Sequence, residues 1–65
     1  MYVKVNLVID GKGIIPMEGE LEPVINMAKR IAKEKKAKEF LLKCQTRKHI
    51  FGIWKKNGTR WVREW

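Results

Sequence analysis

Residues 50–65 read IFGIWKKNGTRWVREW and hold all three tryptophans of the chain, interleaved with lysine and arginine. The Asn57-Gly58 pair between two apolar runs is a strong hairpin signal, because both central residues of a type I′ turn need a positive φ. The stretch therefore predicts two antiparallel strands, residues 50–55 and 61–65. Whether its tryptophans close a core or form a binding surface decides most of the functional interpretation.

Further strands are predicted upstream of this hairpin. Residues 2–9 (YVKVNLVI) alternate apolar and polar side chains, which is typical of a half-buried strand. The DGKG segment at 10–13 predicts a turn, and residues 14–17 are compatible with a short return strand. Residues 40–45 (FLLKCQ) predict the strand that precedes the quoted stretch.

An amphipathic helix is predicted between these strands, and it begins near Glu22-Pro23. Proline is favourable in the first helical turn, and the glutamates around it interact well with the positive end of the helix dipole. Placed at about 100° per residue, the apolar side chains fill one continuous arc of about 160°. They are Val24, Ile25, Met27, Ala28, Ile31 and Ala32.

Together these elements predict an α+β fold for one small domain, residues 1–65. It contains an N-terminal strand or hairpin, one amphipathic helix and a three-stranded antiparallel meander, with the helix packed on one sheet face. The position of the first strand stays open. A direct crossover makes it parallel to strand 40–45, whereas an intervening return strand reverses that direction.

The hairpin turns also predict which side chains share a face of the sheet. A two-residue Asn57-Gly58 loop pairs Trp54 with Trp61, and a two-residue Arg47-Lys48 loop pairs Leu41 with Trp54. Directly opposed residues point to the same side. The helix is then expected to cover Phe40, Leu42, Cys44, Phe51, Ile53 and Val62. The open face is expected to carry Leu41, Lys43, Ile50, Trp54, Trp61, Arg63 and Trp65 around Gly52, whose missing side chain leaves room for another molecule.

Charge is distributed unevenly along the chain. The net charge is +8, and the pI is near 10.0. Residues 1–28 hold two lysines and four acidic residues, whereas residues 29–65 hold thirteen Lys or Arg and three acidic residues. Such asymmetry favours a polyanionic partner, most often nucleic acid.

Length and composition limit the classes of protein to which the chain can belong. A chain of 65 residues has a core that yields only a few kcal/mol of net stability, so dimerisation stays open. The single Cys44 excludes an intramolecular disulfide, and one Cys with one His does not make a zinc site, so we expect no metal and no cofactor. No apolar stretch approaches the roughly 20 residues of a membrane span, and no signal-peptide pattern is present. We expect a cytoplasmic location and no membrane association.

These features predict a small basic nucleic-acid-binding module, with single-stranded nucleic acid or RNA favoured. Indole rings stack on bases, and cations between them contact phosphates. The predicted binding residues are Lys43, Gly52, Trp54, Lys56, Arg60, Trp61, Arg63 and Trp65. Secondary phosphate contacts are predicted at Lys29, Arg30, Lys33, Lys36, Arg47 and Lys48.

Two alternatives stay open at this point. The tryptophan face can be buried in a second copy of the chain or in another protein, without any nucleic-acid role. The rings can also be packed by the chain's own N-terminal segment.

Catalysis is not expected. The only histidine, His49, has cationic neighbours in the sequence and no orienting acid. Cys44 is expected to be a small buried hydrophobe rather than a reactive thiol, because it alternates with Phe40 and Leu42. The DGKG turn lacks the spacing of a phosphate loop.

Overall fold

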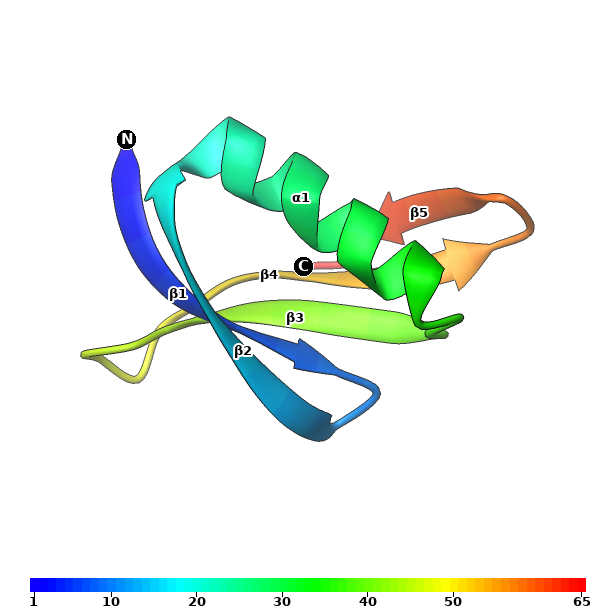
Figure 1. The fold of residues 1–65 in the computed structure, drawn as a ribbon, viewed down its shortest axis with the longest axis horizontal. Coiled ribbons are helices and arrows are strands. Elements are labelled where there is room, and N and C mark those ends of the chain that lie inside the picture. The colour runs from blue at the N-terminus through cyan, green and yellow to red at the C-terminus, as the bar shows by residue number, and fades with distance from the viewer.

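One antiparallel five-stranded sheet carries a single helix across one face in the computed structural model, which describes all 65 residues (Figure 1). The strand order is β2-β1-β3-β4-β5. In chain order the elements are β1 (Tyr2–Ile9), β2 (Lys12–Glu20), α1 (Leu21–Glu34), β3 (Glu39–Cys44), β4 (Ile50–Asn57) and β5 (Arg60–Arg63).

The α+β composition, with one helix packed on one face of an antiparallel sheet, is confirmed. The separation of an N-terminal hairpin from a three-stranded meander is wrong. β1 pairs with β3, and Leu7 lies opposite Leu42, so hairpin and meander form one sheet of five strands. The open question about the first strand is settled by β2, which pairs with β1 along its whole length and reverses the chain before α1 begins.

The β1–β2 turn lies in the segment where the sequence predicts a turn. Ile9 pairs with Lys12, and both central residues, Asp10 and Gly11, have positive φ values of 50° and 68°. This is the pattern of a type I′ turn, which matches the twist of the flanking strands. The Asp10 carboxylate also accepts hydrogen bonds of 3.0 Å from the backbone N–H groups at 38 and 39, and so ties the turn to the start of β3.

The pairing of β3 with β4 differs by one residue from the expected register. Phe40, rather than Leu41, lies opposite Trp54, because a bulge beside Leu42 and Lys43 takes up one residue of β4. A shift of one residue exchanges the two faces of a strand. Trp54 therefore lies on the helix side of the sheet, and Ile53 lies on the opposite side.

The pairing of β4 with β5 differs by two residues from the expected register. Asn57 pairs with Arg60, so the two turn residues are Gly58 and Thr59, and only Gly58 has a positive φ, at 67°. Glycine at the first central position is the requirement of a type II′ turn. A shift of two residues keeps side chains on the same face, so Trp61 stays on the side of Trp54.

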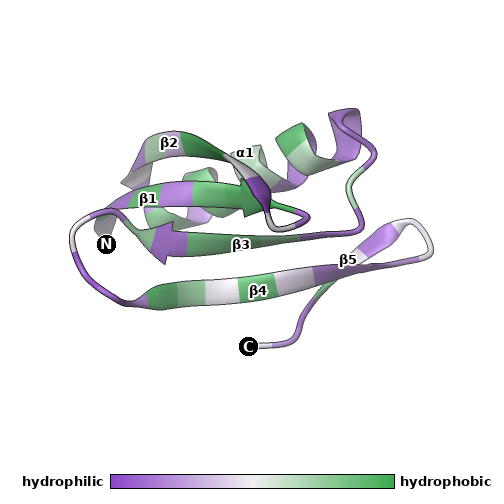
Figure 2. Cartoon of the chain, turned by 90° about the horizontal axis from the view of Figure 1, so that it is seen from below, coloured by the Kyte–Doolittle hydropathy of each residue, from purple (hydrophilic) through white to green (hydrophobic).

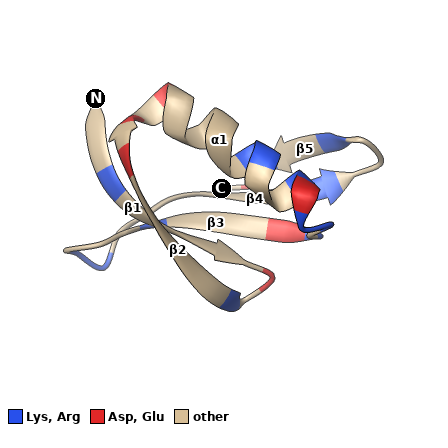
Figure 3. Cartoon of the chain, viewed as in Figure 1, with Lys and Arg blue, Asp and Glu red and all other residues tan.

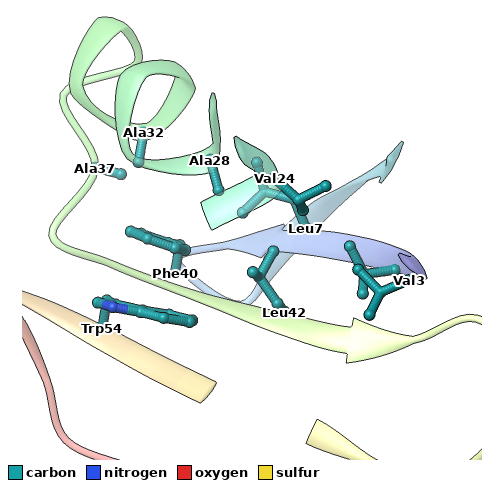
Figure 4. Packing of buried hydrophobic residues seen from close by; sticks show 10 residues of the cluster. Val3, Leu7, Val24, Ala28, Ala32, Ala37, Phe40, Leu42 and Trp54 are labelled. Atoms are coloured by element: carbon teal, nitrogen blue, oxygen red, sulfur yellow. The ribbon is translucent and has the colours of Figure 1, made fainter. Parts of the chain in front are cut away.

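The core lies between α1 and the first three strands. α1 packs on β1, β2 and β3, whereas β4 and β5 lie farther from the helix (Figure 2). The helix buries small side chains, which bring its backbone close to the sheet. Figure 4 shows the buried cluster, with Phe40 between Ala32 and Ala37 on one side and Trp54 on the other. The buried residues are Val3, Val5, Leu7, Val24, Ala28, Ala32, Ala37, Phe40, Leu42 and Trp54.

Candidate nucleic-acid interface

Trp54 closes the core and does not stand on an open face. Its side chain is 3% exposed, and its ring stacks on Phe40 with 5.0 Å between ring centroids and 8° between planes. The expectation that the tryptophans face away from the helix is therefore wrong. The cause is the one-residue register shift between β3 and β4, which places Trp54 beside the helix-covered Phe40.

The other two tryptophans are more accessible. Trp61 is half-buried, and its ring meets the edge of Phe40 at 5.0 Å and 73°. Lys56 places its Nζ 5.9 Å from the Trp61 ring centroid. Trp65 follows β5 and is 63% exposed. Base stacking is thus available from Trp65 and from the open part of Trp61.

Arg63 and Gly52 belong to the packing around Trp54. The Arg63 guanidinium carbon lies 5.2 Å from the Trp54 ring centroid, and this side chain donates hydrogen bonds to the carbonyl oxygens of Phe51 and Trp65. Gly52 is buried, and a Cβ there would lie 2.6 Å from Cη2 of Trp54 and 2.9 Å from Nε of Arg63. Gly52 therefore makes room for the protein's own ring, not for the backbone of another molecule.

The predicted binding residues are divided between two faces. Gly52, Trp54, Lys56, Trp61 and Arg63 lie on the helix side, and the exposed residues Arg60 and Trp65 flank them along the chain. Lys43 lies on the helix-free side, where it pairs with Ile50. The single surface expected to combine Lys43 with the tryptophans is therefore absent.

Basic residues are frequent where α1 ends and the β4–β5 hairpin turns, and two acidic residues, Glu34 and Glu39, lie among them at the end of α1 and the start of β3 (Figure 3). A backbone hydrogen bond of 2.9 Å from Lys56 N–H to the carbonyl oxygen of Lys38 joins the two segments. We call this surface the basic end. It comprises Lys33, Lys36, Lys38, Lys56 and Arg60, all of them exposed.

The remaining secondary contacts are spread over the molecule. Lys29 is half-buried on α1, whereas Arg30 is exposed there. Arg47 and Lys48 lie in the β3–β4 loop, away from α1 (Figure 1). Lys38 belongs to the basic end but is missing from the predicted set. The KEKKAK run at 33–38 was the signal that could have identified it.

Lys36 occupies a strained position within the basic end. Its φ is 55°, and the N–H groups of Lys36 and Ala37 donate to the carbonyl oxygens of Lys33 and Ala32. This is a Schellman motif, in which glycine is the usual residue at the left-handed position. A lysine there lowers the stability of the helix end relative to glycine.

Cys44 is half-exposed, so the expectation of a buried thiol is wrong. Its Sγ lies 3.5 Å from Oγ1 of Thr46. The hydrogen bond from the Thr46 hydroxyl lowers the pKa of the Cys44 thiol, and the backbone N–H groups of Thr46 and Arg47 and the Arg47 charge act in the same direction. Partial desolvation raises the pKa of the thiol, by less than either hydrogen bond from Thr46 lowers it.

The lowered pKa predicts that Cys44 is alkylated at a lower pH than an ordinary cysteine. The thiolate is the reactive form, so the iodoacetamide rate should reach half its maximum at a lower pH in the folded protein than in the urea-unfolded protein. Thr46→Val removes the main cause and should raise this midpoint. The rate is measured against pH by mass spectrometry. Identical midpoints in folded and unfolded protein would contradict the assignment.

The chain brings together no group of three or more His, Cys, Asp or Glu side chains that could hold a metal ion. The His49 ring meets the edge of Phe51 at 4.8 Å and 87°. The one helix has neither the length nor the hydropathy to cross a membrane. No protein-family model, curated protein or solved structure matches the chain.

Proposed function

We propose that this protein is a small, non-enzymatic nucleic-acid-binding module that acts in the cytoplasm, with single strands or RNA as its favoured targets. The observation that carries the proposal is its uncompensated positive charge. Of 15 Lys and Arg residues, only Lys55 forms an ion pair, at 3.4 Å from Glu64. Cations without carboxylate partners are available to neutralise phosphates and release counterions.

The basic end is the main phosphate-binding surface in this proposal. Its five exposed cations come from α1, the segment before β3 and the β4–β5 hairpin, so they follow one end of the molecule. The accessible part of Trp61 lies beside this surface, because Lys56 Nζ is 5.9 Å from its ring centroid, and Trp65 follows the far end of β5. Both offer rings for stacking, at about 1–3 kcal/mol per base. Trp54 is not part of the stacking set, because Phe40 and Arg63 cover its ring.

The strained Lys36 supports a binding role for the basic end. A glycine at this left-handed position would stabilise the helix end, so the lysine lowers stability while adding charge to the surface. Residues that lower stability in this way often serve function.

Lys36→Gly provides the sharpest test of the proposal. It should raise the unfolding free energy by about 1 kcal/mol. At the same time it should reduce the slope of log affinity against log salt by about 1. Affinity is measured by tryptophan-fluorescence titration with single-stranded and duplex oligonucleotides at several salt concentrations, and stability by urea unfolding.

Lys12→Gln is the matched control, because it removes one exposed charge from the β1–β2 hairpin, outside the basic end. It should leave the salt slope unchanged. Absence of oligonucleotide binding by the parent protein at low salt would overturn the proposed function. Binding with the same salt slope in Lys36→Gly would remove the basic end from the interface.

A second candidate, a homodimer or protein-interaction module, is favoured by one observation on the helix-free face. A row of aliphatic residues crosses this face, because Ile14 lies opposite Val8, Val8 opposite Leu41, and Leu41 opposite Ile53. Ile14 is 64% exposed and Val62, on the same face, 44%. This apolar row replaces the tryptophans as the surface that a partner would cover. A dimer mass without salt-dependent oligonucleotide binding would support this candidate.

A further inference from the structure

The largest hollow of the molecule, about 710 Å³, lies between the start of β1 and the β3–β4 loop. Its size is in the range of about 300–1,000 Å³ that is usual for small-ligand sites. Hydrogen bonds hold its two walls together. The backbone N–H of Gln45 donates to the carbonyl oxygen of Lys4 at 3.1 Å, and the Gln45 side-chain amide donates to that of Val5 at 2.9 Å.

The polar lining of this hollow favours a negatively charged ligand. It includes Lys4, Arg47, Lys48 and His49 and no carboxylate, and none of these four side chains forms an ion pair. Cys44 lies in the same wall, and the hydrogen bonds that lower its pKa come from Thr46 and from the loop backbone. The wall therefore already stabilises negative charge at the Cys44 sulfur.

The apolar lining adds the aromatic ring of Phe51. Phe51 has no directly opposed residue on β3, because the bulge places Gly52 opposite Leu42 and Ile50 opposite Lys43. A bulge often changes the direction in which a side chain points. Tyr2 on β1 does not provide a second ring, because its hydroxyl donates a 2.5 Å hydrogen bond to Glu18 on β2, on the other side of β1 from the β3–β4 loop.

We infer that this hollow binds one phosphorylated nucleoside unit. Arg47, Lys48 and Lys4 hold the phosphate, and the base lies against Phe51. Such a ligand requires both an aromatic ring and cations, since stacking accepts any base and the cations neutralise the phosphate. This inference rests on the proposed function for its biological ligand, a nucleic-acid strand, but it concerns a site at the opposite end of the sheet from the basic end.

Protection of Cys44 from iodoacetamide provides a direct test, because the thiol lies in the wall of the hollow. A nucleoside 5′-monophosphate at millimolar concentration should slow alkylation several-fold. Inorganic phosphate should protect less, and the unphosphorylated nucleoside should not protect. Phe51→Leu should abolish the advantage of the monophosphate over inorganic phosphate while leaving the phosphate effect itself.

The double variant Arg47→Gln, Lys48→Gln separates this inference from the proposed function. It should lose the protection by the monophosphate and reduce the salt slope for oligonucleotides by about 2. No protection in the parent protein, or undiminished protection in the double variant, would overturn the site. If the site is overturned but the parent protein still binds oligonucleotides, the proposed function stands. If the monophosphate protects Cys44 but oligonucleotides do not bind, the site stands and the proposed function is rejected.

Discussion

Trp54→Ala should lower the unfolding free energy by about 3–5 kcal/mol, the cost of removing a large aromatic side chain from a packed core. Trp54 is 3% exposed, and its ring centroid lies 5.0 Å from that of Phe40. The guanidinium carbon of Arg63 lies 5.2 Å from the Trp54 ring centroid. A domain of this size has only a few kcal/mol of net stability, so we expect a large unfolded fraction at 25 °C. Far-UV circular dichroism against temperature and urea measures the change.

Trp65→Ala is the matched control for this prediction. It removes the same side chain from an exposed position, and surface changes of this kind stay within about 0.5 kcal/mol. The two variants also separate binding from folding, because Trp65→Ala should weaken oligonucleotide binding in a protein that remains folded. Equal stability of the two variants would show that Trp54 does not close the core.

Gly52→Ala is expected to destabilise the protein by about 1–3 kcal/mol, as overpacking of a filled site does. The new Cβ would lie 2.6 Å from Cη2 of Trp54, well inside van der Waals contact, and 2.9 Å from Nε of Arg63. Two of the three contacts are with an aromatic ring that already rests on Phe40, so the ring has little freedom to move away. The urea midpoint at constant m value measures the loss.

A double-mutant cycle with Trp54→Phe tests the cause of this loss. Phenylalanine lacks the outer carbons of the indole that meet the new Cβ, so the cost of Gly52→Ala should shrink in that background. In an open site, Gly52→Ala would instead stabilise by about 0.4–1 kcal/mol, through the lower entropy of the unfolded chain. That result would contradict the contact with Trp54 and restore Gly52 as a position facing another molecule.

Local patterns along the chain were sufficient to predict most of the elements. Alternation in residues 2–9 predicted β1, and the 3.6-residue period predicted that Val24, Ala28 and Ala32 face the sheet. The DGKG segment predicted the first turn. The joining of β1 to β3 was not predictable in the same way, because it depends on a return strand whose sequence contains Pro16 and two glycines and is a weak strand signal.

The candidate site was predicted less well than the fold. The basic character of residues 29–65 follows from composition alone, and the unpaired cations of the basic end agree with it. The grouping of Trp54, Gly52 and Arg63 with Lys43 as a binding face was wrong, because it depended on a register that two assumed turns supplied. The hollow beside Cys44 also escaped prediction, since it is formed by segments about 40 residues apart.

The sequence by itself determined the number of aromatic and basic side chains, the period of each element and the position of the first turn, because these depend on neighbours within a few residues. Only the tertiary structure decided which face each tryptophan occupies. IFGIW allows either Phe51 and Ile53 or Gly52 and Trp54 to point inward, and the alternation is equally good in both cases. The bulge in β4 selects the second arrangement, in which Trp54 packs on Phe40 across the strand pair and Gly52 provides the space for its ring.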